Sequence, residues 1–176
     1  MPEGFDQLFN LLDQLAKPEK ALRSAVISTH ALHSARIFGQ GKAADGTLIG
    51  KYSKDATYVS NKQSPVKMIP KGKTGRTKFR DGTPHKSRYF EKGYFEFRQT
   101  IGRQSGKVDL RLTGQMQNDY QVDARGEIYV SGFSNTTNYK KATGNEDRFG
   151  KKIFKLSADE QEAFLNAFNT ELSRIQ

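Results

Sequence analysis

Cysteine is absent from this chain of 176 residues, and only three histidines occur. Without cysteine the protein forms no disulfides and offers no thiolate metal ligands, and nothing in the residues indicates an oxidising compartment. Long apolar runs are absent too, since no stretch approaches the ~20 residues that a membrane span requires. The first residues, MPEGFDQLF, lack the basic-then-apolar order of a signal peptide. We therefore predict a protein that is soluble and intracellular when made and that has no membrane partner.

Residue patterns typical of catalytic, cofactor or metal sites are also missing. His30 and His33 lie three residues apart on a predicted helix, but no nearby carboxylate completes a set of metal ligands. The stretch KGKTG at 71–75 has the letters of a phosphate-binding loop in the wrong order, and Asp45-Gly46-Thr47 favours a turn over a calcium loop. No serine or threonine stands in a nucleophile elbow, and no pair of carboxylates stands out. We predict that the protein is not an enzyme and that it holds no metal or cofactor.

Positive charge is abundant but unevenly distributed. The formal net charge is +10, from 29 basic and 19 acidic residues. Residues 1–38 hold four of each sign and residues 89–176 hold 13 basic and 12 acidic ones, whereas residues 39–88 hold 12 basic and three acidic ones. Nine of the ten net charges therefore lie in the middle segment. A strongly positive segment suggests an acidic partner such as nucleic acid.

The middle segment also lacks regular periodicity. It is rich in Gly, Lys, Ser and Thr, and it contains turn signals such as Asp81-Gly82-Thr83-Pro84. Ordering roughly fifty residues costs on the order of 50–100 kcal/mol, while the few large apolar groups of the segment contribute only about 15–25 kcal/mol if fully buried. We therefore predict a long basic loop insertion that becomes ordered against another molecule.

Eight basic side chains of this segment are the candidate contact residues: Lys67, Lys71, Lys73, Arg76, Lys78, Arg80, Lys86 and Arg88. Three roles are open for them. They can contact the phosphates of a nucleic acid in a sequence-independent, salt-dependent way. They can form a solvated loop that keeps the chain soluble. They can also dock on an acidic surface of a neighbouring subunit and fold as they bind.

A small antiparallel sheet is predicted between residues 108 and 133. Apolar and polar residues alternate there in three runs, which is the pattern of half-buried strands. Residues 113–116 interrupt the alternation with a turn or a single helical turn, and Arg125-Gly126 suits a tight connection. The predicted core positions of this sheet are Val108, Leu110, Leu112, Tyr120, Val122, Ile128 and Val130.

Helices are predicted at both ends of the chain, where they cover the apolar face of the sheet. A first helix ends before Pro18, and a second spans 19–38 with Gly39 as its left-handed C-cap. At the other end, Ser157 and Glu160 form a capping box in front of the last helix. The apolar stripe of the first helix is Phe5, Leu8, Phe9, Leu12 and Leu15, and that of the last is Phe164, Leu165, Phe168, Leu172 and Ile175.

Two further segments complete the predicted fold. Residues 89–102 favour a helix that ends at Gly102 over a strand, and residues 138–152 favour a loop with at most a helical turn. We predict a single α+β domain over 1–176, in which a small antiparallel sheet is packed by N-terminal and C-terminal helices. Its parts are a helical region at 1–38, the basic extended insertion at 39–88, and the aromatic segment, sheet and last helix at 89–176.

Four short motifs give the chain a resemblance to a known family. They are RIF at 36–38, DGTLIGKY at 45–52, VDLRLTGQM at 108–116 and FGKKIFKLS at 149–157. Their order before a closing helix resembles the tail-completion proteins of tailed bacteriophages, which are also called virion morphogenesis or head-tail joining proteins. The similarity spans most of the chain, and the middle insertion is longer than the family pattern has it.

The resemblance implies a structural protein of the virion. Proteins of this family form oligomeric rings in the neck, between the portal and adaptor side and the tail tube, after being made in the bacterial host cytoplasm. The expected partners are copies of the chain itself, other neck and tail proteins such as an adaptor, a tail terminator or the tail tube, and DNA transiently in the channel. We expect the densest positive charge to lie mainly at protein contacts, since strong binding to DNA would hinder ejection. The alternative is a sequence-independent nucleic-acid-binding protein that uses residues 39–88.

Overall fold

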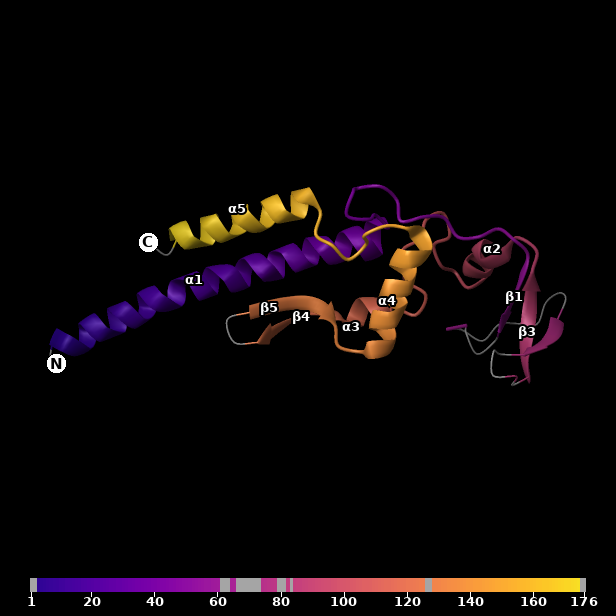
Figure 1. The fold of residues 1–176 in the computed structure, drawn as a ribbon, viewed down its shortest axis with the longest axis horizontal. Helices are drawn as coiled ribbons and strands as arrows, with labels where there is room; N and C mark the ends of the chain where they lie inside the picture. The colour runs from indigo at the N-terminus through magenta and orange to yellow at the C-terminus, as the bar shows by residue number, and fades with distance from the viewer. Residues whose placement is uncertain are drawn as a thin grey trace.

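An elongated α+β fold with two small antiparallel sheets is seen in the computed structural model (Figure 1). The structure describes residues 3–60, 64–65, 74–78, 82, 84–125 and 128–174, and for residues 3–17, 74–78, 84–86 and 125 it gives the backbone alone. Helices from the two ends of the chain lie side by side, as predicted. They form one end of the molecule with a two-stranded hairpin, and a three-stranded sheet forms the other end (Figure 1).

The first helix is a single one. α1 spans Glu3–Ser34 and passes through Pro18, so the predicted break there is wrong. Proline removes one backbone hydrogen bond and crowds the preceding turn, and this local cost does not stop a helix with good helix formers on both sides. A π-helical turn, η1, follows over Ala35–Gln40, and Gly41 at φ 65° provides the left-handed cap that was predicted at Gly39.

The last helix begins where the capping box predicts. α5 spans Ala158–Arg174. The backbone N–H of Ser157 donates to Glu160 Oε2 at 2.8 Å, and the N–H of Glu160 donates to Ser157 Oγ at 3.2 Å. α5 runs antiparallel to α1 (Figure 1). Within residues 18–34 of α1, the buried positions recur every four residues and are mostly small, which lets neighbouring elements approach closely; they are Ala21, Ala25, Thr29 and His33. Ile175 lies outside the described residues.

The hairpin beneath α1 is confirmed, but with a different inner face. β4 (Tyr120–Arg125) pairs antiparallel with β5 (Ile128–Phe133). The register places Tyr120 opposite Phe133 and Val122 opposite Ser131, so these four residues share the face toward α1. Ile128 and Val130 lie on the other face and are 66% and 41% exposed. The prediction that they belong to the core is therefore wrong.

Residues 108–112 do not form the predicted third strand of that hairpin sheet. Val108 and Asp109 are adjacent and both buried, which strict alternation between two faces does not allow. The N–H of Val108 donates to the carbonyl of Gly50 at 3.0 Å, and Leu110 has a φ of 54°, outside the strand region. Val108 is a core residue, whereas Leu110 and Leu112 are half-buried at the edge of the two core clusters. A short helix, α3 (Gln115–Asp119), lies where we predicted a turn or a single helical turn.

The described part of residues 39–88 is not the extended loop that we predicted. Its first residues form a turn closed by a bridge between Lys42 and Leu48, and Ile49 is buried in the main core. Three strands follow, in the antiparallel order β1 (Thr57–Ser60), β3 (Pro84–Phe90), β2 (Thr74–Lys78). Within these parts, Ile49 and Val59 pack against apolar residues from the rest of the chain.

Two further helices complete the fold. α2 spans Gly93–Thr100, so the helix predicted over 89–102 is confirmed with narrower bounds, and its first residues belong to β3. α4 spans Thr136–Phe149, where we predicted a loop. Asn135 caps α4 by accepting a hydrogen bond from the N–H of Thr137 at 2.8 Å, and Gly150 at φ 61° ends it. The sequence hides this helix because few of its residues are apolar and only Asn138 and Ala142 are buried.

The apolar core has two parts. The larger cluster joins η1, the turn at 43–49, the stretch at 108 and the loop before α5, and its buried members are Ile37, Phe38, Ala43, Ile49, Val108, Met116, Tyr120, Ala142 and Ile153. The smaller cluster lies between α2 and the three-stranded sheet and consists of Val59, Phe90 and Phe97. A cleft opens where the two parts meet.

Candidate functional site

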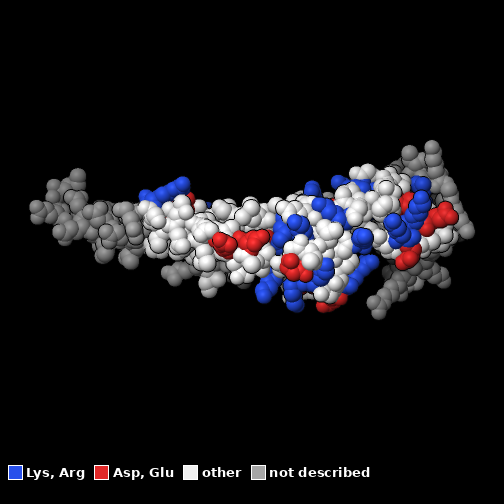
Figure 2. All heavy atoms as spheres, turned by 90° about the horizontal axis from the view of Figure 1, so that it is seen from above, with Lys and Arg blue, Asp and Glu red and all other residues white. Residues whose placement is uncertain are grey.

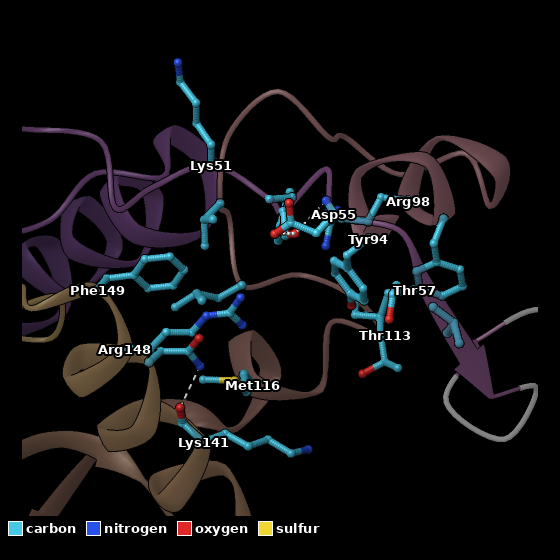
Figure 3. Close-up of a pocket in the computed structure, with 18 of the residues that line it drawn as sticks. Lys51, Asp55, Thr57, Tyr94, Arg98, Thr113, Met116, Lys141, Arg148 and Phe149 are labelled. Atoms are coloured by element: carbon cyan, nitrogen blue, oxygen red, sulfur yellow. Dashed lines mark hydrogen bonds between the residues drawn. The ribbon is translucent and has the colours of Figure 1, made fainter. Parts of the chain in front are cut away.

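The cleft is formed by four segments that are far apart in the sequence. It has a volume of about 750 Å³ and is lined by residues of 51–59, α2, 108–116 and α4 (Figure 3). Gly93 makes the junction at α2 possible: it has a φ of 60°, and a Cβ at this position would lie 2.2 Å from the carbonyl oxygen of Asp55. The backbone of 54–55 can therefore approach α2 closely only because residue 93 is glycine.

Aromatic and apolar side chains form much of the wall of the cleft. The ring centroids of Tyr52 and Tyr94 are 5.5 Å apart, and those of Tyr94 and Phe97 are 5.2 Å apart. Met116 and Phe149 line the side that faces α4 (Figure 3). A wall of this composition binds apolar side chains of a ligand or a partner by removing both surfaces from water.

A buried ion pair holds the aromatic wall in place. Arg98 is 1% exposed, and its Nη2 donates to Asp109 Oδ1 at 2.9 Å. Asp109 Oδ1 also accepts from the hydroxyl of Tyr52 at 2.9 Å and from the N–H of Arg111 at 3.0 Å. The guanidinium of Arg98 lies 4.2 Å from the ring centroid of Tyr52. Burial raises the pKa of Tyr52, so its hydroxyl stays protonated and remains a donor.

The rim of the cleft carries excess positive charge. Lys51, Lys141 and Arg148 are exposed, and among the described residues none of their side-chain nitrogens has a hydrogen-bond or ion-pair partner. Arg148 extends from α4 toward the cleft, with its guanidinium 5.4 Å from the ring of Phe149, whereas the amine of Lys51 points outward (Figure 3). Asp55, whose Oδ2 accepts from the hydroxyl of Ser53 at 3.0 Å, is the acidic residue of the lining. The site therefore suits a partner that is both apolar and acidic.

The structure describes half of the predicted basic contact residues. Lys67, Lys71, Lys73 and Arg80 lie outside the described residues. The register of the three-stranded sheet places Arg76 directly opposite Lys86, Lys78 opposite Pro84, and Thr74 opposite Arg88. Because directly opposite residues share a face, Arg76, Lys78, Lys86 and Arg88 occupy positions on one face of β2 and β3. The register thus groups four of the eight predicted residues.

A second buried charge cluster connects α1 to α5 at a distance from the cleft. Arg36 Nε donates to Glu160 Oε1 at 2.7 Å, and His33 Nδ1 lies 3.0 Å from Glu160 Oε2. The other guanidinium nitrogens of Arg36 donate to the carbonyls of Lys42, Ile153 and Lys155. Burial raises the pKa of Glu160, but the hydrogen bonds from Arg36 and Ser157 lower it more, so the net pKa is lowered and the carboxylate is ionised.

The two predicted helix histidines have different neighbours. His33 is buried and bonded to Glu160, and burial lowers its pKa despite that carboxylate. His30 Nδ1 lies 2.8 Å from Ser131 Oγ of β5, and its ring stacks on Tyr120. Among the described residues, no three His, Asp or Glu side chains lie close enough together to hold a metal ion. Within the same residues no helix is both long and apolar enough to cross a membrane.

The sequence gives only weak evidence that these charged residues form buried ion pairs. Arg36 lies on the apolar side of the predicted helix, and a charge in that position indicates a buried partner without identifying it. Glu160 was identified for its capping role alone. The cleft has no signal of its own, because its walls come from separate segments. No family model, curated protein or solved structure matches this chain.

Proposed function

We propose that the protein is a structural subunit of a tailed bacteriophage, which assembles into an oligomeric ring in the neck and joins or completes the tail at the head-tail connector. One observation carries the assembly part of this proposal. The first turns of α1 extend beyond α5 and beyond the β4–β5 hairpin, and no other described helix or strand lies alongside them (Figure 1). We call residues 3–16 of α1 the N-terminal arm.

The sequence of the N-terminal arm requires a partner. Phe5, Leu8, Phe9, Leu12 and Leu15 recur at the spacing of one helix face. Burying five side chains of this size is worth about 8–15 kcal/mol relative to leaving them in water. Most helical stability in proteins also comes from packing of the apolar face. An arm that no other described helix or strand covers therefore favours assembly.

Two further features support a role in the phage neck. The order of the four short motifs resembles tail-completion proteins, whose function is to form rings. The elongated shape keeps the arm and the cleft far apart on one subunit (Figure 1). Two different surfaces at a distance give head-to-tail contacts, which close into a ring when the rotation between subunits permits.

The assembly is tested by placing charge on the apolar face of the arm. Leu8→Asp with Leu12→Asp should convert a discrete oligomer into a monomer in light scattering, and the variant should not complement a phage that lacks the protein. Gln7→Asp with Gln14→Asp is the matched control, because it adds the same charge on the opposite face of the same helix. Normal rings from the leucine variant would contradict the proposal.

Sequence-independent binding of nucleic acid is the second candidate, and the grouping of basic positions on β2 and β3 favours it. If the four residues contact phosphates, retention on DNA should fall steeply with salt, with a slope of about 0.9 per contact. Arg76→Gln with Lys86→Gln should then reduce that slope, whereas Lys152→Gln with Lys155→Gln, on exposed residues of the loop before α5, should leave it unchanged. No retention at ~0.15 M salt would argue against this candidate.

A further inference from the structure

The N-terminal arm is acidic as well as apolar. Glu3, Asp6 and Asp13 are its charged residues, and no lysine or arginine precedes Lys17. The chain as a whole is strongly basic, with a formal charge of +10, whereas the arm has no positive side chain, a property that it shares with residues 156–173. A partner surface for the arm must therefore accept both leucine and phenylalanine side chains and negative charge.

The cleft has the complementary chemistry. Its wall includes Tyr52, Tyr94 and Phe149, and its rim carries Lys141 and Arg148, which have no acidic partner among the described residues. Figure 2 shows that most of the Lys and Arg atoms visible on the face it draws lie over the middle and the sheet end of the molecule. A volume of about 750 Å³ is large enough for several apolar side chains of one helix face.

The arm cannot occupy the cleft of its own subunit. α1 is one continuous helix from Glu3 to Ser34, and it directs the arm away from the part of the molecule that contains α2 and α4 (Figure 1). The cleft lies beyond the other end of this helix. Contact between the two surfaces must therefore join different copies of the chain.

We infer that the N-terminal arm of one subunit docks in the cleft between α2 and α4 of the next subunit, with its apolar face on the aromatic wall and its carboxylates facing Lys141 and Arg148. This inference rests on the proposed ring and identifies the two surfaces that form it. The contact is head-to-tail, because the arm and the cleft are different surfaces. The unpaired cations at the rim select the acidic arm over the basic surfaces of the same protein.

A charge exchange tests the contact in the full-length protein. Asp6→Lys with Asp13→Lys in the arm, or Lys141→Glu with Arg148→Glu at the cleft, should each raise the concentration at half-assembly roughly tenfold or more, because like charges then face each other. Combining all four substitutions in one chain should restore assembly. Glu91→Lys with Glu162→Lys is the control for the arm variant, because it adds the same positive charge at two residues that are exposed and lie outside the cleft lining. Circular dichroism checks that each variant keeps its helices.

A covalent probe gives an independent readout, because the natural chain has no cysteine. Leu12→Cys in the arm together with Gln115→Cys, an exposed residue of the cleft lining, should form disulfides between subunits and give a ladder of oligomers under oxidation. Gln14→Cys with Gln115→Cys places the arm thiol on the opposite helix face and should give little or none.

The outcomes separate this inference from the proposed function. Loss of assembly in both reversal variants, recovery in the combined variant and the disulfide ladder together support arm docking. Rings that form normally in the reversal variants, without a ladder, overturn arm docking and leave the ring proposal standing. A disulfide-linked dimer from Leu12→Cys alone shows arms that pair with each other, which also overturns it. A natural chain that stays monomeric at every concentration overturns both.

Discussion

At the helical end of the molecule a buried arginine joins parts of the chain that are far apart, whereas at the sheet end a buried arginine joins parts that are close. Arg36 bonds Glu160, which is 124 residues away, and so ties α1 to α5. Arg98 bonds Asp109, which is 11 residues away, and so ties α2 to the stretch that follows it. Both guanidiniums also donate to backbone carbonyls, Arg36 to that of Ile153 and Arg98 to that of Arg111.

The difference shows what each ion pair does in the fold. The pair at the helical end links α1 to the start of α5, so we expect its loss to weaken the docking of α5. The pair at the sheet end shapes a surface, because Asp109 also holds the hydroxyl of Tyr52 in the wall of the cleft. We therefore expect substitutions at the helical end to act mainly on stability, and those at the sheet end to act on both stability and docking.

Glu160→Gln should have the largest effect on stability. The substitution keeps a side chain that can complete the capping box but leaves Arg36 buried without its counter-ion, which typically costs about 3–5 kcal/mol. The measurement is the free energy of unfolding from urea denaturation. Glu162→Gln, an exposed residue two positions along α5, is the matched control and should change stability by less than about 0.5 kcal/mol. A Glu160→Gln loss as small as the control's would show that the pair does not hold α5.

Arg98→Lys should lower stability less than Glu160→Gln does, but it should also weaken assembly. Lysine keeps the positive charge near Asp109 but cannot reproduce the planar guanidinium, which also donates to the carbonyl of Gln104 and stacks on Tyr52. Losing a hydrogen bond to a charged group costs about 1.5–3 kcal/mol. Assembly should weaken as well, because the position of Tyr52 in the cleft wall depends on Asp109. Arg103→Lys is the control, since Arg103 is exposed and outside the cleft. Unchanged assembly at lowered stability would separate this ion pair from docking.

The elements that the sequence predicts well are those whose pattern is decided locally. The 3.6-residue spacing identifies α1 and α5, the capping box at Ser157 locates the start of α5, and alternation identifies β4 and β5. In each case the side chains repeat at the period of the element that they form. The turn at Asp45-Gly46-Thr47 is of the same kind, because Asp45 accepts from the N–H and hydroxyl of Thr47.

The elements that the sequence misses are those decided by distant partners. Residues 108–112 alternate like a strand, but the bond from Asp109 to Arg98 and the bond from Val108 to Gly50 impose a different backbone. The register of the hairpin also depends on tertiary contacts. The observed pairing of β4 with β5 places Ile128 and Val130 on the face away from α1, whereas we predicted them in the core. The cleft could not be predicted for the same reason: no single segment contains it.

Acidification should produce the smallest loss of stability. This loss arises at the helical end of the molecule. Burial lowers the pKa of His33 and of His30 below the ordinary value of 6.5. The unfolded chain then binds more protons than the folded one as the pH falls through about 6.5, so stability is present above that pH and decreases below it. The slope cannot exceed about 1.4 kcal/mol per pH unit for one group. Urea denaturation at pH 7.5 and 5.5 measures the difference.

His33→Gln should remove part of the pH dependence of stability. The substitution deletes the buried imidazole, while glutamine can still donate a hydrogen bond to Glu160. The remaining part belongs to His30, and His30→Gln in the same chain should flatten the profile between pH 7.5 and 5.5. The lowered pKa of Glu160 does not interfere, since its contribution is lost only below its ordinary value of 4.5. Equal pH dependence in the natural chain and the double variant would show that neither histidine couples to folding. Substitutions around Arg98 should leave the contribution of His30 and His33 unchanged, because the contacts of these two histidines lie at the helical end.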